Sequence, residues 1–148
     1  MSKQQFMAEN LQEGEIYAGL ILGKDGAADY HLFLQPGKAT GVTWQAAMDW
    51  AKKLGHSLPT RAEQALLFAN LKHEFEPRYY WSSEQAGPSN AWDQNFYNGF
   101  QYYDSRSYEG RARAVRRSSR CGLHARAAGR RIFRLPPQQT QYPQRPGV

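Results

Sequence analysis

Asp93 and Asp104 lie at equal sequence distances from the dipeptide Asn98-Gly99, and two carboxylates held close together can share a proton or bind a cation. Asn-Gly favours a two-residue β-hairpin turn, which fixes the register of the strands on either side. In that register Asp93 lies directly opposite Asp104. Calcium takes roughly six or more oxygen ligands, so the pair alone is a poor calcium site. The two carboxylates could also act as an acid/base pair, which would make this chain a hydrolase.

The same hairpin predicts a surface that could bind a ligand. With Trp92 and Phe96 pointing inward, the other face is open to solvent and carries aromatic and polar side chains. Tyrosine supplies contact area at low entropy cost and asparagine supplies adaptable hydrogen bonds, as in antibody paratopes. An ordinary solvated hairpin, in which aromatic cross-strand pairs only stabilise the sheet, is the alternative. The further predicted pairs on this face are Asn95 with Tyr102 and Tyr97 with Phe100.

The predicted ligand surface combines polar, acidic and aromatic residues of the C-terminal half. No catalytic residue, metal site or cofactor is predicted, because the four histidines have no ligand spacing and the only cysteine is Cys121. The predicted ligand-binding residues are Glu84, Asn90, Asp93, Asn95, Tyr97, Tyr102, Asp104, Arg106 and Tyr108.

Basic residues interleaved with tyrosines mark the end of this half. Such a pattern can bind single-stranded nucleic acid, but nearby acids make salt bridges the favoured use. The acids that could serve are Glu84, Asp104 and Glu109. The basic residues are Arg106, Arg111, Arg113, Arg116 and Arg117.

The net charge of +6 belongs entirely to one end of the chain. Residues 1–117 contain 13 Lys and Arg and all 13 acids, so the remaining six arginines fall in 118–148. We therefore predict an N-terminal arm over 1–14, a neutral domain over 15–117, and a basic Arg/Pro/Gln-rich tail over 118–148 that is disordered. The N-terminus lacks a signal-peptide pattern and no segment has the length of a membrane span, which predicts a cytoplasmic protein without membrane contact.

The predicted elements follow from periodicity and capping signals. Residues 15–22 and 29–35 favour a β-hairpin, and 1–14 a short helix or a frayed arm. Thr43 and Thr60 are helix N-caps, the second in a capping box with Glu63. The alternating run at 111–115 predicts one final strand. Trp81 and Trp92 are expected in the core.

Four motifs carry a resemblance to a known family. They are L-P-T-R-x-E-Q at 58–64, Y-W-S-S-E at 80–84, A-W-x-Q-x-F-x-N-G at 91–99 and R-A-R-A-V-R at 111–116. In this order they resemble a bacterial and phage domain family found at the C-terminus of Lcl-type collagen-like adhesins and in short prophage proteins. The resemblance implies an α+β domain of C-type-lectin-like fold, with two helices on a small mixed or antiparallel sheet and an irregular C-terminal half that presents a ligand.

The resemblance implies a non-enzymatic, prophage-encoded module that binds a protein or a glycan, in the host cytoplasm or on the virion. The alternative is an intracellular phage accessory or counter-defence protein that inhibits a host factor, with weak nucleic-acid contact through the basic tail. Neither function requires a cofactor, and the sequence does not predict an oligomeric state.

Overall fold

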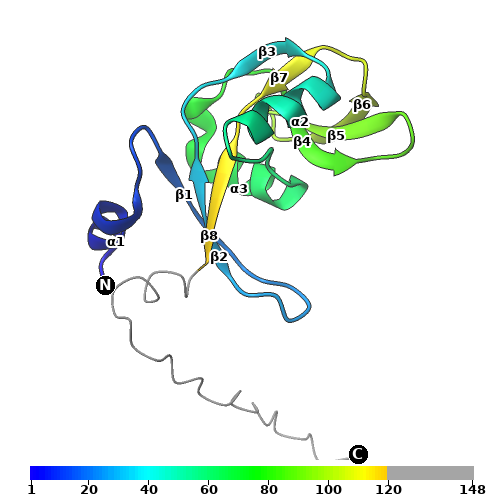
Figure 1. Cartoon of the computed structure of the whole chain (residues 1–148). Coiled ribbons are helices and arrows are strands. Elements are labelled where there is room, and N and C mark those ends of the chain that lie inside the picture. Colours follow the sequence, from blue (N-terminus) through cyan, green and yellow to red (C-terminus); the bar gives the residue numbers. More distant parts are fainter. Residues whose placement is uncertain (120–148) are drawn as a thin grey trace, which may run out of the picture.

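The computed structural model describes residues 1–119, which form an α+β structure of helices packed on two β-sheets (Figure 1). The α+β class predicted from the sequence is confirmed. The helices are α1 Lys3–Asn10, α2 Trp44–Lys53 and α3 Arg61–Leu71, the last continued by the 3₁₀ helix Lys72–Glu74. The strands are β1 Ile16–Ile21, β2 Tyr30–Leu34, β3 Ala39–Val42, β4 Tyr79–Gln85, β5 Asn90–Asn95, β6 Gln101–Ser105, β7 Gly110–Ala112 and β8 Val115–Ser119.

Both predicted helix starts are confirmed. The Thr43 hydroxyl accepts a hydrogen bond from the Ala46 N–H at the start of α2. At the start of α3, Thr60 Oγ1 accepts from the Glu63 N–H at 3.2 Å, and Glu63 Oε1 accepts from the Thr60 N–H at 2.8 Å. This reciprocal capping box satisfies two backbone donors that the first turn of a helix leaves unpaired.

The first sheet, in the order β1-β2-β8, joins strands from both ends of the described chain. The β1–β2 hairpin is the one predicted from residues 15–35. Side chains alternate along β2, so Leu32 and Leu34 face α3 through Leu67, whereas Phe33 faces α1 through Phe6. The N-terminal segment is therefore a helix that covers the outer face of this sheet.

The second sheet has the order β3-β7-β4-β5-β6, with β4 and β7 parallel and the other pairs antiparallel. Its two faces carry different helices. Trp81 of β4 packs with Trp44 and Ala47 of α2, whereas Tyr80 packs with Leu67 of α3. Along its own face α2 lies over β3, β4 and β7, so the β5–β6 end of that face extends beyond the helix (Figure 1).

The prediction of a single final strand over 111–115 is wrong. The chain changes sheets after Ala112, ending β7 in one sheet and starting β8 in the other at Val115. At the crossing, the Arg113 guanidinium donates to the backbone carbonyls of Glu74 at 2.7 Å and Gln35 at 3.0 Å. These contacts hold the connection between the two sheets.

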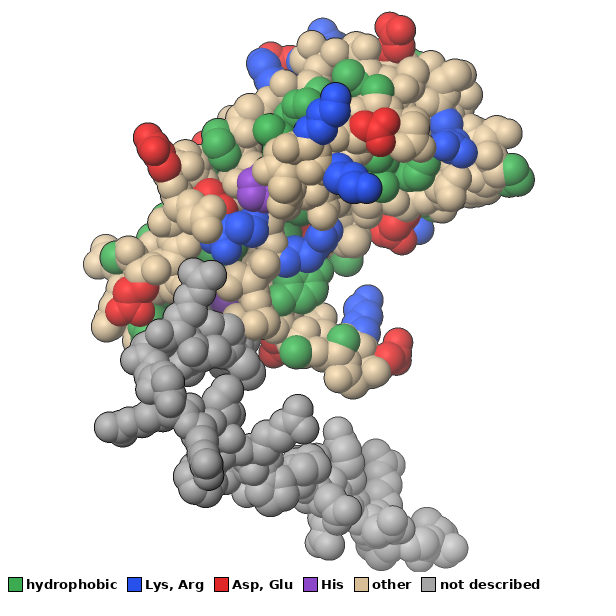
Figure 2. All heavy atoms as spheres, viewed as in Figure 1, with side chains coloured by type: hydrophobic (Ala, Val, Ile, Leu, Met, Phe, Trp, Pro, Cys, Tyr) green, Lys and Arg blue, Asp and Glu red, His purple; other side chains and the backbone are tan. Residues whose placement is uncertain are grey.

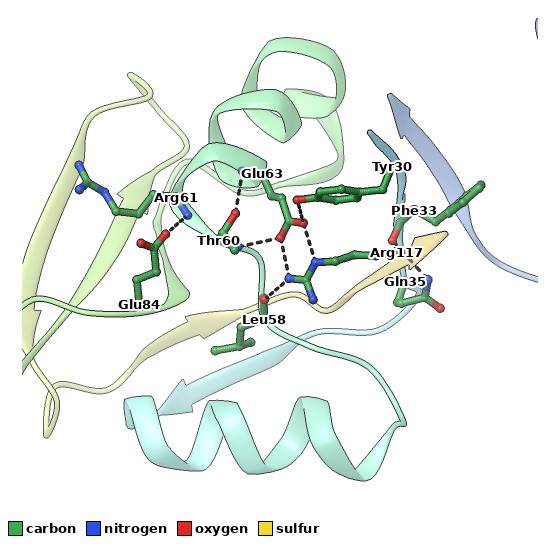
Figure 3. Close-up of polar contacts among 9 residues, drawn as sticks. All are labelled: Tyr30, Phe33, Gln35, Leu58, Thr60, Arg61, Glu63, Glu84 and Arg117. Atoms are coloured by element: carbon green, nitrogen blue, oxygen red, sulfur yellow. Dashed lines mark hydrogen bonds and ion pairs between the residues drawn. The ribbon is translucent and has the colours of Figure 1, made fainter. Parts of the chain in front are cut away.

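A buried ion pair ties α3 to β8 (Figure 3). Arg117 Nε and Nη2 donate to the two carboxylate oxygens of Glu63 at 2.6 and 2.7 Å, and the Tyr30 hydroxyl donates to Glu63 at 2.7 Å. Glu63 is fully buried. Burial alone raises the pKa of its carboxyl, but the donors from Arg117, the Thr60 backbone and Tyr30 outweigh burial and lower the pKa.

The described chain continues two residues past the predicted domain boundary, because β8 ends at Ser119. The rest of the predicted basic tail, with its predicted disorder and nucleic-acid contact, lies outside the described residues. None of the helices within residues 1–119 combines the length and the apolar character that crossing a bilayer requires.

Candidate functional site

The face of the second sheet beyond α2 contains part of the predicted ligand surface. Directly opposite residues of neighbouring strands share a face of the sheet, and Asp93 lies opposite Trp81 on β4 and Tyr102 on β6. Asp104 lies on the same face, opposite Ala91. The structure therefore brings both aspartates and a tyrosine together at the uncovered end of the sheet.

The predicted register of the β5–β6 hairpin is wrong by one pair on this face. The Asn95 N–H donates to the Phe100 carbonyl at 2.9 Å, so four residues rather than two form the connection. Phe96 is not paired with β6. Its N–H donates to the Arg78 carbonyl, next to β4, and its ring is buried in the core. Burial of this aromatic ring decides the register, and Asp93 lies opposite Tyr102 instead of Asp104.

The predicted exposure of Asp93 is also wrong. The aromatic residues directly opposite it, Trp81 and Tyr102, flank its side chain, and only 1% of the residue is exposed. Neither oxygen of Asp93 accepts a hydrogen bond from an N–H or from a hydroxyl donor of the described residues. Burial, together with the adjacent Asp104 carboxyl, raises the pKa of Asp93 to about 9. Asp93 is therefore protonated at neutral pH, beside the Asp104 carboxyl.

Exposed aromatic rings surround this carboxyl pair. Tyr102 contacts Phe100 on one side and Tyr79 on the other, in edge-to-face pairs with centroids 6.2 and 6.1 Å apart. Tyr102 is 45% exposed and Phe100 is 58% exposed. Tyr108 stacks its edge on Trp81. Figure 2 shows hydrophobic side chains reaching the surface at the hairpin end of the molecule.

A small cavity of about 200 Å³ lies beside these rings. Tyr79 and Tyr108 form part of its wall, and the edge strand β3 and its neighbour β7 contribute Gly41 and Arg111. We call the surface formed by Tyr79, Phe100, Tyr102, Asp104 and Tyr108 the aromatic face. Tyr79 and Phe100 were not predicted as ligand residues. Phe100 lies two residues before Tyr102, and Tyr79 lies two residues before Trp81, which is opposite Asp93. Alternation along each strand is therefore the sequence signal that could have found them.

The opposite face of the hairpin is occupied by α3. Trp92 is half-buried, not fully in the core as predicted, and the Arg61 guanidinium stacks on its ring at 3.6 Å from the centroid. Gln101 accepts from Arg61 Nε at 3.0 Å and donates to the Arg61 carbonyl at 2.7 Å. Gln94 donates to the Gln64 carbonyl at 2.9 Å. These contacts fix the hairpin to the helix.

Among the other predicted ligand residues, Asn95 shares the aromatic face, since it lies opposite Tyr79 on β4, whereas Glu84, Asn90, Tyr97 and Arg106 are not gathered there. Glu84 accepts from the Arg61 N–H at the start of α3, and the Arg106 guanidinium lies 4.7 Å from the Trp44 ring at the start of α2. Asn95 accepts from the Tyr97 N–H within the turn, where Tyr97 is exposed. Asn90 begins β5 opposite Ser105, one position out of phase with Asp93. Their observed contacts serve the fold.

Within residues 1–119, three of the five basic residues at the end of the domain form salt bridges, but with other acids than those predicted. Arg111 pairs with Glu76, Arg116 with Glu15 and Arg117 with Glu63. The predicted partners Glu84, Asp104 and Glu109 are close in sequence, whereas the observed partners come from distant segments. The predicted ion pairs do not form because β7 lies between β3 and β4, and β8 lies beside β2, so neither strand is next to β6.

The described residues contain no cluster of three or more His, Cys, Asp or Glu side chains placed to hold a metal ion. The class that the structure defines is an α+β domain with two sheets and an aromatic face around a carboxyl pair. No protein-family model and no curated protein matches this chain.

Proposed function

We propose that this domain is a non-enzymatic binding module of C-type-lectin-like type that holds a protein or glycan ligand on the aromatic face. The observation that supports the proposal is the pair of exposed rings Phe100 and Tyr102, fixed by contacts with each other and with half-buried Tyr79 beside an acidic pair. Because the rings are already held by neighbours, little side-chain entropy is lost when a ligand covers them. The prophage origin, with action in the host cytoplasm or on the virion, belongs to the same proposal.

The chain topology supports the C-type-lectin-like part of the proposal. Strands from the two ends of the domain, β2 and β8, pair with each other, and α2 and α3 precede the half that carries the aromatic face. The ligand side chains then come from β4, β6 and the loops after β5 and β6. In such an arrangement the sequence of these loops can change without loss of the fold, because the pairing of β2 with β8 stabilises the domain.

The chemistry of the face suits a ligand with an apolar surface and hydrogen-bond donors. Aromatic rings pack against the apolar face of a sugar or against apolar protein side chains. Asp104, which is partly exposed, accepts hydrogen bonds from hydroxyl or amide groups. Because Asp93 keeps its proton at neutral pH, its carboxyl adds no negative charge to this face.

The same geometry argues for binding rather than hydrolysis. The hydrolase hypothesis required the two carboxyls to be close, and the register makes them neighbours, with Asp104 opposite Ala91, two residues before Asp93. A general acid must also come within hydrogen-bond reach of the atom it protonates. Asp93 is only 1% exposed, so a bound substrate would not reach it.

Ligand capture on glycan arrays and from bacterial lysate tests this function. We expect the double variant Phe100→Ala/Tyr102→Ala to lose binding while keeping the fold, since both rings are exposed. Tyr103→Ala is the matched control, because Tyr103 is equally exposed but lies opposite Trp92 on the other face of β6. Retention of binding by the double variant, or its loss in Tyr103→Ala alone, would show that the aromatic face is not the ligand site.

A further inference from the structure

A second and larger cavity lies away from the aromatic face. Its volume is about 540 Å³, within the range of small-molecule sites in proteins. It opens between α2, the segment that leads into α3, and the strands β4 and β8. The lining side chains carry hydroxyl groups, basic groups and one acid around an apolar floor. Its walls are formed by Gln45, Met48, Asp49, Lys52, His56, Ser57, Leu58, Thr60, Ser83 and Arg117.

Three side chains of this cavity, Lys52, His56 and Arg117, have N–H donors that form no hydrogen bond within residues 1–119. Neither Lys52 nor the His56 ring forms a side-chain hydrogen bond or ion pair within residues 1–119. Arg117 uses Nε and Nη2 for Glu63 and Leu58, which leaves Nη1 without a partner among the described groups (Figure 3). Basic side chains and a histidine are visible together on the α2 face in Figure 2.

These three residues have different roles. Glu63 neutralises Arg117 and fixes the guanidinium, so Arg117 offers an oriented N–H donor more than a net charge. Lys52 supplies a positive charge without a counter-ion in the described part of the chain. The neutral or charged His56 ring supplies an N–H donor. A fixed donor beside a free ammonium is an arrangement that binds a single oxyanion.

The apolar and acidic walls restrict the ligand further. Met48 and buried Leu58 provide a surface for a short apolar group. Asp49, whose carboxylate accepts from Gln45 at 3.1 Å, places one negative charge in the wall. That charge repels polyanions such as nucleic acid more strongly than a molecule with one anionic group.

We propose that this cavity binds a small organic anion, with its carboxylate or phosphate group held by Lys52, His56 and Arg117 and its apolar part against Met48 and Leu58. The site is separate from the aromatic face, so either proposal can fail without the other. The two chemical sources of the oxyanion, a carboxylic acid or a phosphate monoester, are separated by the probes used to test it.

The test is an NMR titration of the full chain at constant ionic strength, using propionate, inorganic phosphate and the neutral isostere propionamide. We expect saturable shifts of the Ser57 and Ser83 amides with one of the two anions and none with propionamide. The anion that saturates identifies the class of ligand. Absence of saturation by both anions across the millimolar range, or equal shifts with propionamide, would overturn the proposal.

Two lysine variants show whether binding is local. Lys52→Gln should weaken binding of the anion by about tenfold, the effect of one lost hydrogen bond to a charged group. Lys53→Gln is the matched control, since Lys53 is the next residue of the same helix and does not line the cavity. Equal weakening by both variants would indicate diffuse attraction to a basic helix end and would contradict the assigned site.

Discussion

The Arg117 guanidinium forms a two-point ion pair with the buried Glu63 carboxylate, 54 residues earlier in the chain. Glu63 also caps its own helix through Thr60 and accepts a hydrogen bond from Tyr30. One carboxylate thus links the start of α3, the strand β2 and the strand β8. The pair closes the domain and fixes one wall of the larger cavity.

Removal of the Glu63 charge should strongly destabilise the domain. In Glu63→Gln the side chain can still cap Thr60, but Arg117 keeps a partly buried charge without its partner. The expected loss in the free energy of unfolding is on the order of 3 kcal/mol. Urea unfolding measures it, and Glu9→Gln on the exposed side of α1 should change stability by no more than about 0.5 kcal/mol. Equal small effects would mean that the ion pair contributes little.

Glu15 should make the domain sensitive to acid. Burial raises the pKa of its carboxyl, but donors from Arg116, Gln35 and Gln12 outweigh burial and lower it from 4.5 to about 2. A lowered folded-state pKa stabilises the protein fully above the unfolded value, and this contribution is lost as the pH falls from about 4.5 to 2. Thermal unfolding from pH 6 to pH 2 should therefore show a shallower decline in Glu15→Gln than in the unmodified chain. Parallel curves for both proteins would contradict this pairing.

Asp93 should have the opposite pH dependence. Its pKa is raised from 3.8 to about 9, so between these values the folded protein holds a proton that the unfolded chain has released. Stability from this group is present below about pH 4 and declines as the pH rises towards 9. We expect Asp93→Asn to be more stable than the unmodified chain at pH 8, with a difference that narrows towards pH 4. A less stable variant at pH 8 would show that the ionised carboxylate has a favourable partner.

Gly99 should not tolerate a side chain. Its φ is +81°, and a Cβ there would lie 2.7 Å from the Phe68 ring. Gly99→Ala should cost about 1 kcal/mol for the left-handed backbone, with a further loss from the displaced ring. Gly37→Ala isolates the backbone cost, since Gly37 has φ +87° and a Cβ added there would meet nothing within 4 Å. Chemical denaturation of both variants should place Gly99→Ala clearly lower; equal stabilities would mean that the Phe68 contact relaxes freely.

Local signals in the sequence predicted the helix starts and the first hairpin, because each depends on residues a few positions apart. The Thr60 capping box needs only Glu63 three residues later, and the β1–β2 hairpin needs only two apolar segments and a polar loop. The sequence also indicated that Asp93, Tyr102 and Asp104 share one face, since alternation along a strand is set by the backbone. It did not predict which position lies opposite which.

Long-range packing decided the remaining features of the candidate site. Burial of Phe96 in the core set the hairpin register that the Asn98-Gly99 signal misplaced, and the aromatic rings beside Asp93 excluded water from a carboxylate expected at the surface. Arg117 pairs with Glu63 and not with a nearby acid because β8 crosses to the first sheet. The sequence by itself determined the helix starts, the first hairpin and the alternation of side chains along each strand. Only the tertiary structure decided which of those side chains are buried or paired, because partners far apart in the chain meet only after the sheets have assembled.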